Sequence, residues 1–203
     1  MSTGTTTRLT TASRQAEIIA AALRLARDRS PALITTTDLA QAIGVSQGAL
    51  FKHFETKEAI WLAAMEWVRE HLLHELQTAA ADSARPVAAL RKVFDAHVAF
   101  VVAHPGVPRM IFHELQQPAD SPLKESVRSL MKGYRQLLLS LLKQAAQDGE
   151  LAAGVDAQAA ATLFLGIMQG LVMQSMLSGH VSTIRNEAPR VFELYLRSIR
   201  PQS

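Results

Sequence analysis

The chain contains no cysteine, few aromatic residues (5%) and few charged residues (19%). The lack of cysteine excludes disulfides and cysteine catalysis, and it is consistent with a reducing cytoplasm. No long apolar run stands at the N-terminus, so no secretory signal peptide is expected. Paired carboxylates, a Ser-His arrangement and a glycine-rich phosphate loop are also absent, which predicts a non-enzymatic protein without a cofactor.

A membrane span is not expected either, because no uncharged apolar run clearly reaches about 18 residues. The closest stretch, Ala157 to Leu177, contains Gln158, Gln169 and Gln174 among many small residues. Such side chains are typical of a packed helix interface. With 48% hydrophobic residues, the 203-residue chain can bury a core in one large domain or two small ones.

Apolar residues recur at helical spacing throughout the chain, and no stretch alternates as a strand does. The sequence therefore predicts an all-α protein. A helix from Lys57 to about Ala81 would span roughly 40 Å at about 1.5 Å per residue, enough to link two domains. The other expected helices, outside the motif described next, are Gln15–Asp28, Val87–His104, Pro105–Gln116, Pro122–Gln147, Asp156–Ser178 and Arg185–Ile199.

One stretch, from Thr35 to Lys57, has the pattern of a helix-turn-helix. Thr35 is an N-cap candidate with Asp38 three residues later, an acidic variant of the capping box. Gly44 stands where a left-handed residue ends the first helix, and Ser46 caps a second, short helix. A helix-turn-helix places its second helix in the major groove of DNA. Because the net charge is only +3, the DNA-binding prediction depends on this motif.

The motif and its surroundings, about residues 12 to 65, resemble the headpiece of the tetracycline-repressor (TetR) family of bacterial regulators. The residues that carry the resemblance are Asp38-Leu39-Ala40, Gly44-Val45-Ser46, Gly48-Ala49-Leu50-Phe51, His53-Phe54 and Thr56-Lys57-Glu58. The resemblance implies an N-terminal three-helix DNA-binding domain and a larger C-terminal helical domain for ligand binding and dimerisation. The expected division is a flexible arm over 1–13, the DNA-binding domain over 14–60 (motif about 35–54) and the C-terminal domain over 61–203.

The recognition helix, about Gln47 to His53, can contact DNA in two ways. The Gln47 amide can read a base edge, while Ala49 can touch a thymine methyl where Gly48 lets the backbone approach. Lysine and histidine side chains, and hydroxyls at the helix N-termini, would contact phosphates. The predicted DNA-binding residues are Thr35, Thr36, Ser46, Gln47, Gly48, Ala49, Phe51, Lys52, His53 and Lys57. The resemblance implies this use for all of them except Thr36 and Ala49. Phe51 replaces the family's usual tyrosine and offers only apolar contact.

The C-terminal region mixes methionine, aromatic and occasional polar side chains, a pattern typical of an adaptable apolar pocket and also of an ordinary core. The resemblance implies a small-molecule site among these helices. The expected pocket residues are Trp67, His71, Phe100, His104, Met110, Phe112, His113, Met168, Gln169 and Met173.

Gly166 and Gly170 lie four residues apart and would let two helices approach closely. The resemblance implies that the last two long helices of each chain form a four-helix dimer interface. The expected interface residues are Leu163, Gly166, Gly170, Leu171, Gln174, Val191 and Leu194. A twofold dimer would read two half-sites of a palindromic operator.

Several histidines of the C-terminal region are candidates for a metal site. His71 and His74 lie three residues apart, and His97 and His104 lie seven apart, so two pairs could meet around a divalent ion. Such histidines are more often hydrogen-bonded core or surface groups, and no metal site is predicted.

Together these observations predict a cytoplasmic, homodimeric transcriptional regulator. It would be a repressor, released from a palindromic operator on double-stranded DNA by a small apolar or amphipathic effector. Two alternatives stay open. A DNA-binding architectural protein without an inducer is favoured if side chains fill the pocket, and a helical small-molecule carrier is favoured if the motif binds no DNA.

Overall fold

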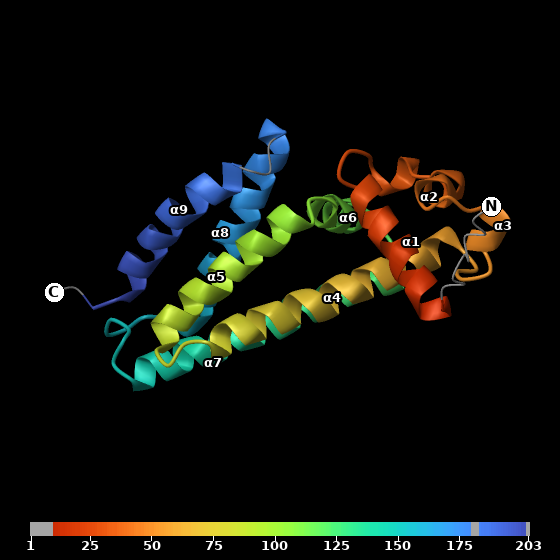
Figure 1. The fold of residues 1–203 in the computed structure, drawn as a ribbon. Coiled ribbons are helices and arrows are strands. Elements are labelled where there is room, and N and C mark those ends of the chain that lie inside the picture. Colours follow the sequence, from red (N-terminus) through yellow and green to blue (C-terminus); the bar gives the residue numbers. More distant parts are fainter. Residues whose placement is uncertain (1–9, 180–182, 202–203) are drawn as a thin grey trace, which may run out of the picture.

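The computed structural model describes residues 10–179 and 183–201, and within them every regular element is a helix (Figure 1). The all-α prediction is confirmed. In chain order the elements are α1 (Thr11–Leu25), the short 3-10 helix η1 (Pro31–Leu33), α2 (Thr36–Ala42), α3 (Gln47–Leu50), α4 (Lys57–Ala81), α5 (Pro86–Ala103), α6 (Gly106–Leu115), α7 (Pro122–Gln147), α8 (Ala157–Ser178) and α9 (Thr183–Ile199).

The headpiece, formed by α1, η1, α2, α3 and the start of α4, occupies one end of the molecule (Figure 1). Its core is apolar, with Ile18, Leu39, Leu50 and Ile60 fully buried. Burial of these side chains holds the short α2 and α3 in place, since helices of this length are not stable alone in water.

The first helix differs from its prediction at both ends. It begins at Thr11 because the Thr10 hydroxyl accepts a hydrogen bond from the Ser13 amide and caps it. It ends at Leu25, before the expected Asp28. Residues 11–13 of the predicted arm therefore belong to α1, and residues 1–9 of that arm lie outside the described residues.

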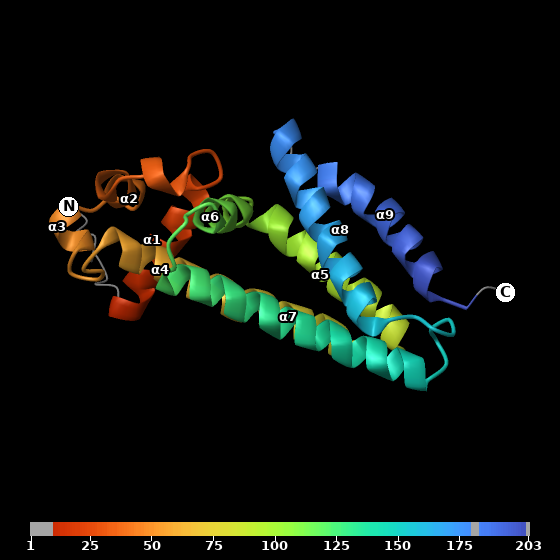
Figure 2. The same ribbon diagram turned by 180° about the vertical axis from the view of Figure 1, so that it is seen from behind.

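Helix α4 has the predicted bounds and is capped by Thr56, whose hydroxyl accepts a hydrogen bond from the Ala59 amide. It leaves the headpiece and runs alongside α5 and α7 in the C-terminal part (Figures 1 and 2). The division proposed at residue 60 falls inside this uninterrupted helix. The headpiece and the C-terminal helices thus share one structural element.

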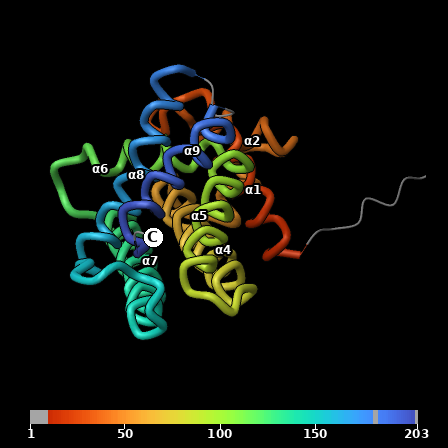
Figure 3. Tube along the Cα trace, turned by 90° about the vertical axis from the view of Figure 1, so that its left-hand side faces the viewer, coloured from red at the N-terminus to blue at the C-terminus, as the bar shows by residue number. Residues whose placement is uncertain are grey.

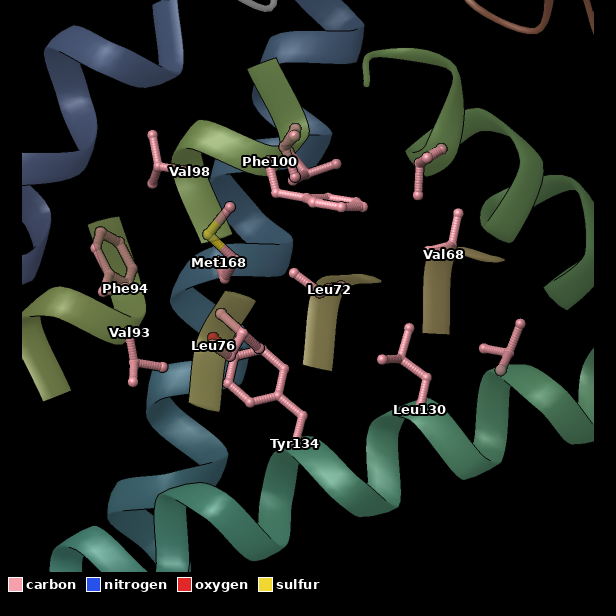
Figure 4. Close-up of a cluster of buried hydrophobic side chains, with 14 of the residues drawn as sticks. Val68, Leu72, Leu76, Val93, Phe94, Val98, Phe100, Leu130, Tyr134 and Met168 are labelled. Atoms are coloured by element: carbon pink, nitrogen blue, oxygen red, sulfur yellow. The ribbon is translucent and has the colours of Figure 1, made fainter. Parts of the chain in front are cut away.

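The C-terminal helices α4, α5, α7, α8 and α9 gather into a bundle, seen end-on in Figure 3. Side chains from four of them meet in the core drawn in Figure 4, which includes Leu72, Phe94, Tyr134 and Met168. Next to this core, Phe94 stacks on Phe192 with ring centroids 4.2 Å apart, and both rings meet Phe164 edge-on. These edge-on contacts are a favourable aromatic geometry.

Helix α8 is long and apolar enough to cross a membrane by length and composition, and 39% of its most apolar window is buried inside the protein. It packs against α7 and α9. Its uncovered side carries Leu163, Met173 and Leu177, and α9 adds the exposed Leu194. One side of this helix is therefore core, and the other is an apolar surface.

Phe164→Ala should lower the free energy of unfolding by about 3–5 kcal/mol, because the ring is fully buried among Phe94, Phe192 and Tyr195. Urea denaturation followed by circular dichroism, at one fixed protein concentration, would measure the change. The exposed Lys132→Ala on α7 is the control and should stay within about 0.5 kcal/mol of wild type. A cost below about 1 kcal/mol for Phe164→Ala would show that the ring does not support the bundle.

Candidate nucleic-acid interface and effector cavities

The first helix of the motif is fixed by the predicted capping box. The Thr35 hydroxyl accepts from the Asp38 amide at 3.1 Å, and the Asp38 carboxylate accepts from the Thr35 amide at 2.7 Å. Arg29, in the loop after α1, donates to the same carboxylate at 2.9 Å. Hydrogen bonds from Arg29 and Thr35 hold the pKa of Asp38 well below its usual value. Sequence reasoning missed Arg29. The path of the loop after α1, which the sequence pattern does not fix, brings its guanidinium to the Asp38 carboxylate.

The turn and the second helix also form as predicted. Gly44 has φ +68°, a left-handed value that favours glycine, and the Val45 amide donates back to the Ala40 carbonyl at 3.0 Å. The Ser46 hydroxyl accepts from the Ala49 amide and caps α3. Regular helix covers only Gln47–Leu50, and turns continue through His53. The expected recognition helix is therefore a single helical turn with a turn-rich extension.

The predicted DNA-binding side chains lie on one end of the molecule, and most of them are exposed. Those exposed are Thr35, Ser46, Gln47, Gly48, Phe51 and Lys52, and those half-buried are Thr36, Ala49, His53 and Lys57. These assignments stay predictions.

Internal hydrogen bonds hold several residues of this set in place. Gln47 donates to the Thr36 hydroxyl at 2.6 Å, which links the two motif helices. Lys57 donates to the Ala32 carbonyl of η1 at 3.1 Å. The His53 carbonyl accepts from Gln15 of α1, while the buried His53 Nδ1 has no hydrogen-bond partner among the described residues. The recognition segment is thus anchored to α1, α2 and η1.

Two family models match the chain. Residues 18–64 match the bacterial regulatory proteins of the tetR family, and residues 113–188 match the tetracyclin repressor-like C-terminal domain. The first match contains the helix-turn-helix and the second contains α7 and α8. The chain belongs to the TetR family of bacterial transcriptional regulators. The predicted family and the predicted class of DNA-binding regulator are confirmed.

Individual relatives are distant but cover most of the chain. The nucleoid occlusion factor SlmA of Vibrio cholerae is 25% identical over 158 residues, which are 77% of this chain and 81% of SlmA. A TetR transcription regulator from Haloarcula marismortui has the same fold, with a TM-score of 0.80 at 18% identity over 94% of this chain and 100% of that one. AibR, solved in complex with isovaleryl coenzyme A and operator DNA, has a TM-score of 0.67 at 25% identity over 79% of this chain and 86% of its own.

Two cavities lie at the junction of the headpiece and the C-terminal helices of this TetR-family chain. The first, about 370 Å³, lies between η1, the start of α4 and the α6–α7 connection, and is lined by Lys57, Trp61 and Met110 among others. The second, about 510 Å³, lies between α1, α4 and the α5–α6 turn. We call this second one the α1 cavity. Its lining residues are Ala16, Ile19, Ala20, Leu23, Arg24, Arg27, Trp67, Ala103, His104 and Pro105.

The ten predicted pocket residues do not come together in one pocket. Met110 and His113 line the first cavity, and Trp67 and His104 line the α1 cavity. The others take different places: Phe100 and Met168 fill the core, Phe112 is half-buried against it, and His71, Gln169 and Met173 are exposed. Four of the ten do come together, because the Trp67 ring contacts the rings of His71, Phe100 and His104. The pocket assignment stays a prediction.

Of the histidines, His71 and His104 both pack against the Trp67 ring, whereas His97 contacts Tyr134. His97 is half-buried, with Nδ1 3.2 Å from the Tyr134 hydroxyl, and desolvation of its ring lowers its pKa to about 4. It is neutral at physiological pH. His71 lies instead against the Trp67 carbonyl, 2.8 Å away. Over residues 10–179 and 183–201, no group of three or more His, Asp or Glu side chains is placed to hold a metal.

The predicted dimer residues lie on the outer side of α8 and α9. Leu163, Gly166, Gly170, Gln174 and Leu194 are exposed, and Leu171 and Val191 are half-buried. A Cβ added at either glycine would meet nothing within 4 Å. None of the described residues covers that surface, and its use as an interface stays a prediction.

Asp38→Ala should lower the melting temperature at pH 7, because α2 loses its capping box and Arg29 loses its partner. A lowered folded-state pKa stabilises the fold above the unfolded value of about 3.9, and this contribution is lost as the pH falls. The difference in melting temperature between wild type and variant should therefore shrink from about pH 5 toward pH 2. Circular dichroism would follow it.

The control for this series is Glu55→Ala, which removes an exposed carboxylate of the same headpiece. It should leave the melting temperature nearly unchanged across the range. An Asp38→Ala difference that is equally large at both ends of the pH series would contradict the assigned role of the carboxylate.

Proposed function

We propose that this protein is a homodimeric, cytoplasmic repressor without enzymatic activity, which binds a palindromic operator and is released by a small amphipathic effector. The observation that carries the proposal is the capped, exposed α3 at the tip of the headpiece, joined by the continuous α4 to a helical bundle. Members of the TetR family are DNA-binding regulators, and this geometry supports the same use here.

Each DNA-binding side chain has a separate task in this proposal. Gln47, at the start of α3, reads a base edge, with its amide oriented by Thr36. Lys52 and Lys57 neutralise phosphates and set the position of the headpiece on the duplex. Exposed Phe51, 42% accessible, contributes apolar contact only.

Dimerisation follows from the outer surface of α8 and α9. Leu163, Leu177 and Leu194 are 48%, 75% and 64% exposed, which is unusual for leucines clustered on neighbouring helices. Gly166 and Gly170 let a second copy of α8 approach its backbone. A twofold pairing covers this surface and presents two recognition helices at a fixed spacing.

Release by an effector requires that the ligand prefer one arrangement of the headpiece over another. Both cavities touch the headpiece and the C-terminal helices at once, and α4 borders each of them. A ligand in either cavity can bias the angle of α4 and so the spacing of the recognition helices. AibR, which binds both isovaleryl coenzyme A and operator DNA, supports an effector for this chain.

A DNA-binding architectural protein without an inducer is the second candidate. The 25% identity to the nucleoid occlusion factor SlmA favours it, as does the filled aromatic core of the bundle. The two open cavities at the junction favour the repressor.

Selection of bound sequences from a random duplex pool tests the function directly. A dimeric reader should enrich a palindrome with half-sites about one helical turn apart. On the enriched site, Gln47→Ala should change the preferred base at one position of each half-site. Lys52→Ala and Lys57→Ala should weaken binding to all sequences alike. Each should also reduce the slope of log binding constant against log salt concentration by about one. Equal behaviour of the three variants, or no enrichment at all, would overturn the proposed reader.

Gly170→Leu should leave the fold intact and prevent dimerisation, because the added side chain meets open space within the chain but would obstruct a second α8. Sedimentation velocity should show a monomer, and affinity for the palindrome should fall at least tenfold. Lys143→Leu, which adds the same side chain to an exposed site on α7, is the matched control. A Gly170→Leu dimer as tight as wild type would place the interface elsewhere.

A further inference from the structure

The α1 cavity has an apolar floor with positive charge beside it. Ala16, Ile19, Ala20 and Leu23 of α1 form the apolar side, and Trp67 and His104 add aromatic rings whose centroids are 5.1 Å apart. Among residues 10–179 and 183–201, the only formally charged ones that line it are Arg24 and Arg27, and no acidic residue does. The lining is therefore amphipathic, with charge of one sign.

These two arginines differ from most others in the described chain. Arg14, Arg29 and Arg85, for example, donate to carboxylates at 2.7, 2.9 and 2.8 Å. Seven of the fourteen arginines in the described residues have a carboxylate oxygen within 3.2 Å, and Arg24 and Arg27 are not among them.

Arg24 instead reaches only the Ala42 carbonyl, at 3.3 Å, and Arg27 lies 3.6 Å from Asp28, beyond a normal hydrogen bond. Each guanidinium carries five N–H donors in a planar fork that matches a carboxylate. Arg24 lies in the last turn of α1 and Arg27 in the turn that follows it, and both line the α1 cavity. They retain donors for an anion at the cavity.

We propose that the α1 cavity binds an amphipathic anion, a carboxylate joined to an apolar body. The carboxylate pairs with Arg24 and Arg27, and the apolar body lies along the alanine and isoleucine floor toward Trp67. The volume of about 510 Å³ is in the ordinary range for small-molecule sites. Burial lowers the pKa of His104 and so disfavours a positive charge on its ring.

The site also lies where α6 is tied to α1. A Cβ at Gly106 would stand 1.9 Å from the Leu23 carbonyl oxygen, so only glycine permits this backbone contact. Arg109 of α6 donates to the Arg27 carbonyl at 3.3 Å. A ligand held between α1 and the α5–α6 turn bears on the same contact. The effect of this ligand on the DNA affinity of the protein rests on the proposed function, whereas the binding of the ligand itself does not.

Each of the two tryptophans of the chain lines a different cavity, Trp61 the first and Trp67 the α1 cavity. The probes are ω-bromooctanoate and ω-bromooctanol, which share a bromine that quenches nearby indole fluorescence and differ in charge. In Trp61→Phe, which retains Trp67, ω-bromooctanoate should quench the Trp67 fluorescence saturably. The uncharged ω-bromooctanol should bind about tenfold more weakly. In Trp67→Phe, quenching of Trp61 should be weak. The opposite pattern, or equal binding of both probes, would overturn the proposal.

The arginines are tested in the full chain, because both are surface residues whose replacement leaves the core unchanged. Arg24→Gln with Arg27→Gln should weaken ω-bromooctanoate binding at least tenfold, to the level of the alcohol, while alcohol binding stays constant. Arg185→Gln with Arg200→Gln removes two exposed arginines elsewhere and should change neither. A lower melting temperature with unchanged carboxylate binding would show that the arginines only support α1, and would overturn the site.

The effect on DNA is measured separately, by fluorescence anisotropy of the selected operator with and without saturating ω-bromooctanoate. Wild type should show a several-fold change in affinity that the double arginine variant lacks. Probe binding without this change would refute regulation from the α1 cavity. Failure to bind any operator, with probe binding intact, would instead count against the proposed function.

Discussion

Burial of α4 against two different sets of partners is the constraint on which the structure depends. Its first turns place Ile60 and Trp61 in the headpiece core, and its last turns place Leu72 and Leu76 in the bundle. Because a helix satisfies its backbone hydrogen bonds internally, it moves as a stiff rod. The position of the recognition segment is therefore set by how the far end of α4 packs between α5 and α7.

A second connection restricts that rod. The backbone of α6 touches α1 at Gly106, close enough that an alanine there would collide with the Leu23 carbonyl. The headpiece is thus attached through α4 and through the contacts of α6 with α1 and η1. The two cavities lie beside these attachments, where a bound molecule contacts elements of both parts. Differential contact of this kind is what an allosteric ligand needs.

The bundle itself combines a packed interior with an apolar exterior. Phe94, Phe164 and Phe192 fill the space between α5, α8 and α9, and this packing gives the bundle a rigid core. The outer sides of α8 and α9 remain apolar and exposed. A rigid core with an apolar outer surface suits a protein whose two copies must hold their headpieces at a fixed distance.

The sequence by itself determined the helices and the motif. The bounds of α4 and α7 match their predictions to the residue, and the Thr35–Asp38 capping box forms as expected. These features depend on caps and helix breakers that act within a few residues, so local chemistry decides them. The family followed from the same local pattern.

Only the tertiary structure decided which faces are buried and where the cavities lie. Met168 is in the core while Met173, on the same helix, is exposed, because α8 is apolar nearly all around and its periodicity selects no single face. The α1 cavity joins residues near position 20 with Trp67 and His104. Contacts over such sequence distances depend on how stiff helices pack against one another, which the spacing of apolar residues within each helix does not fix.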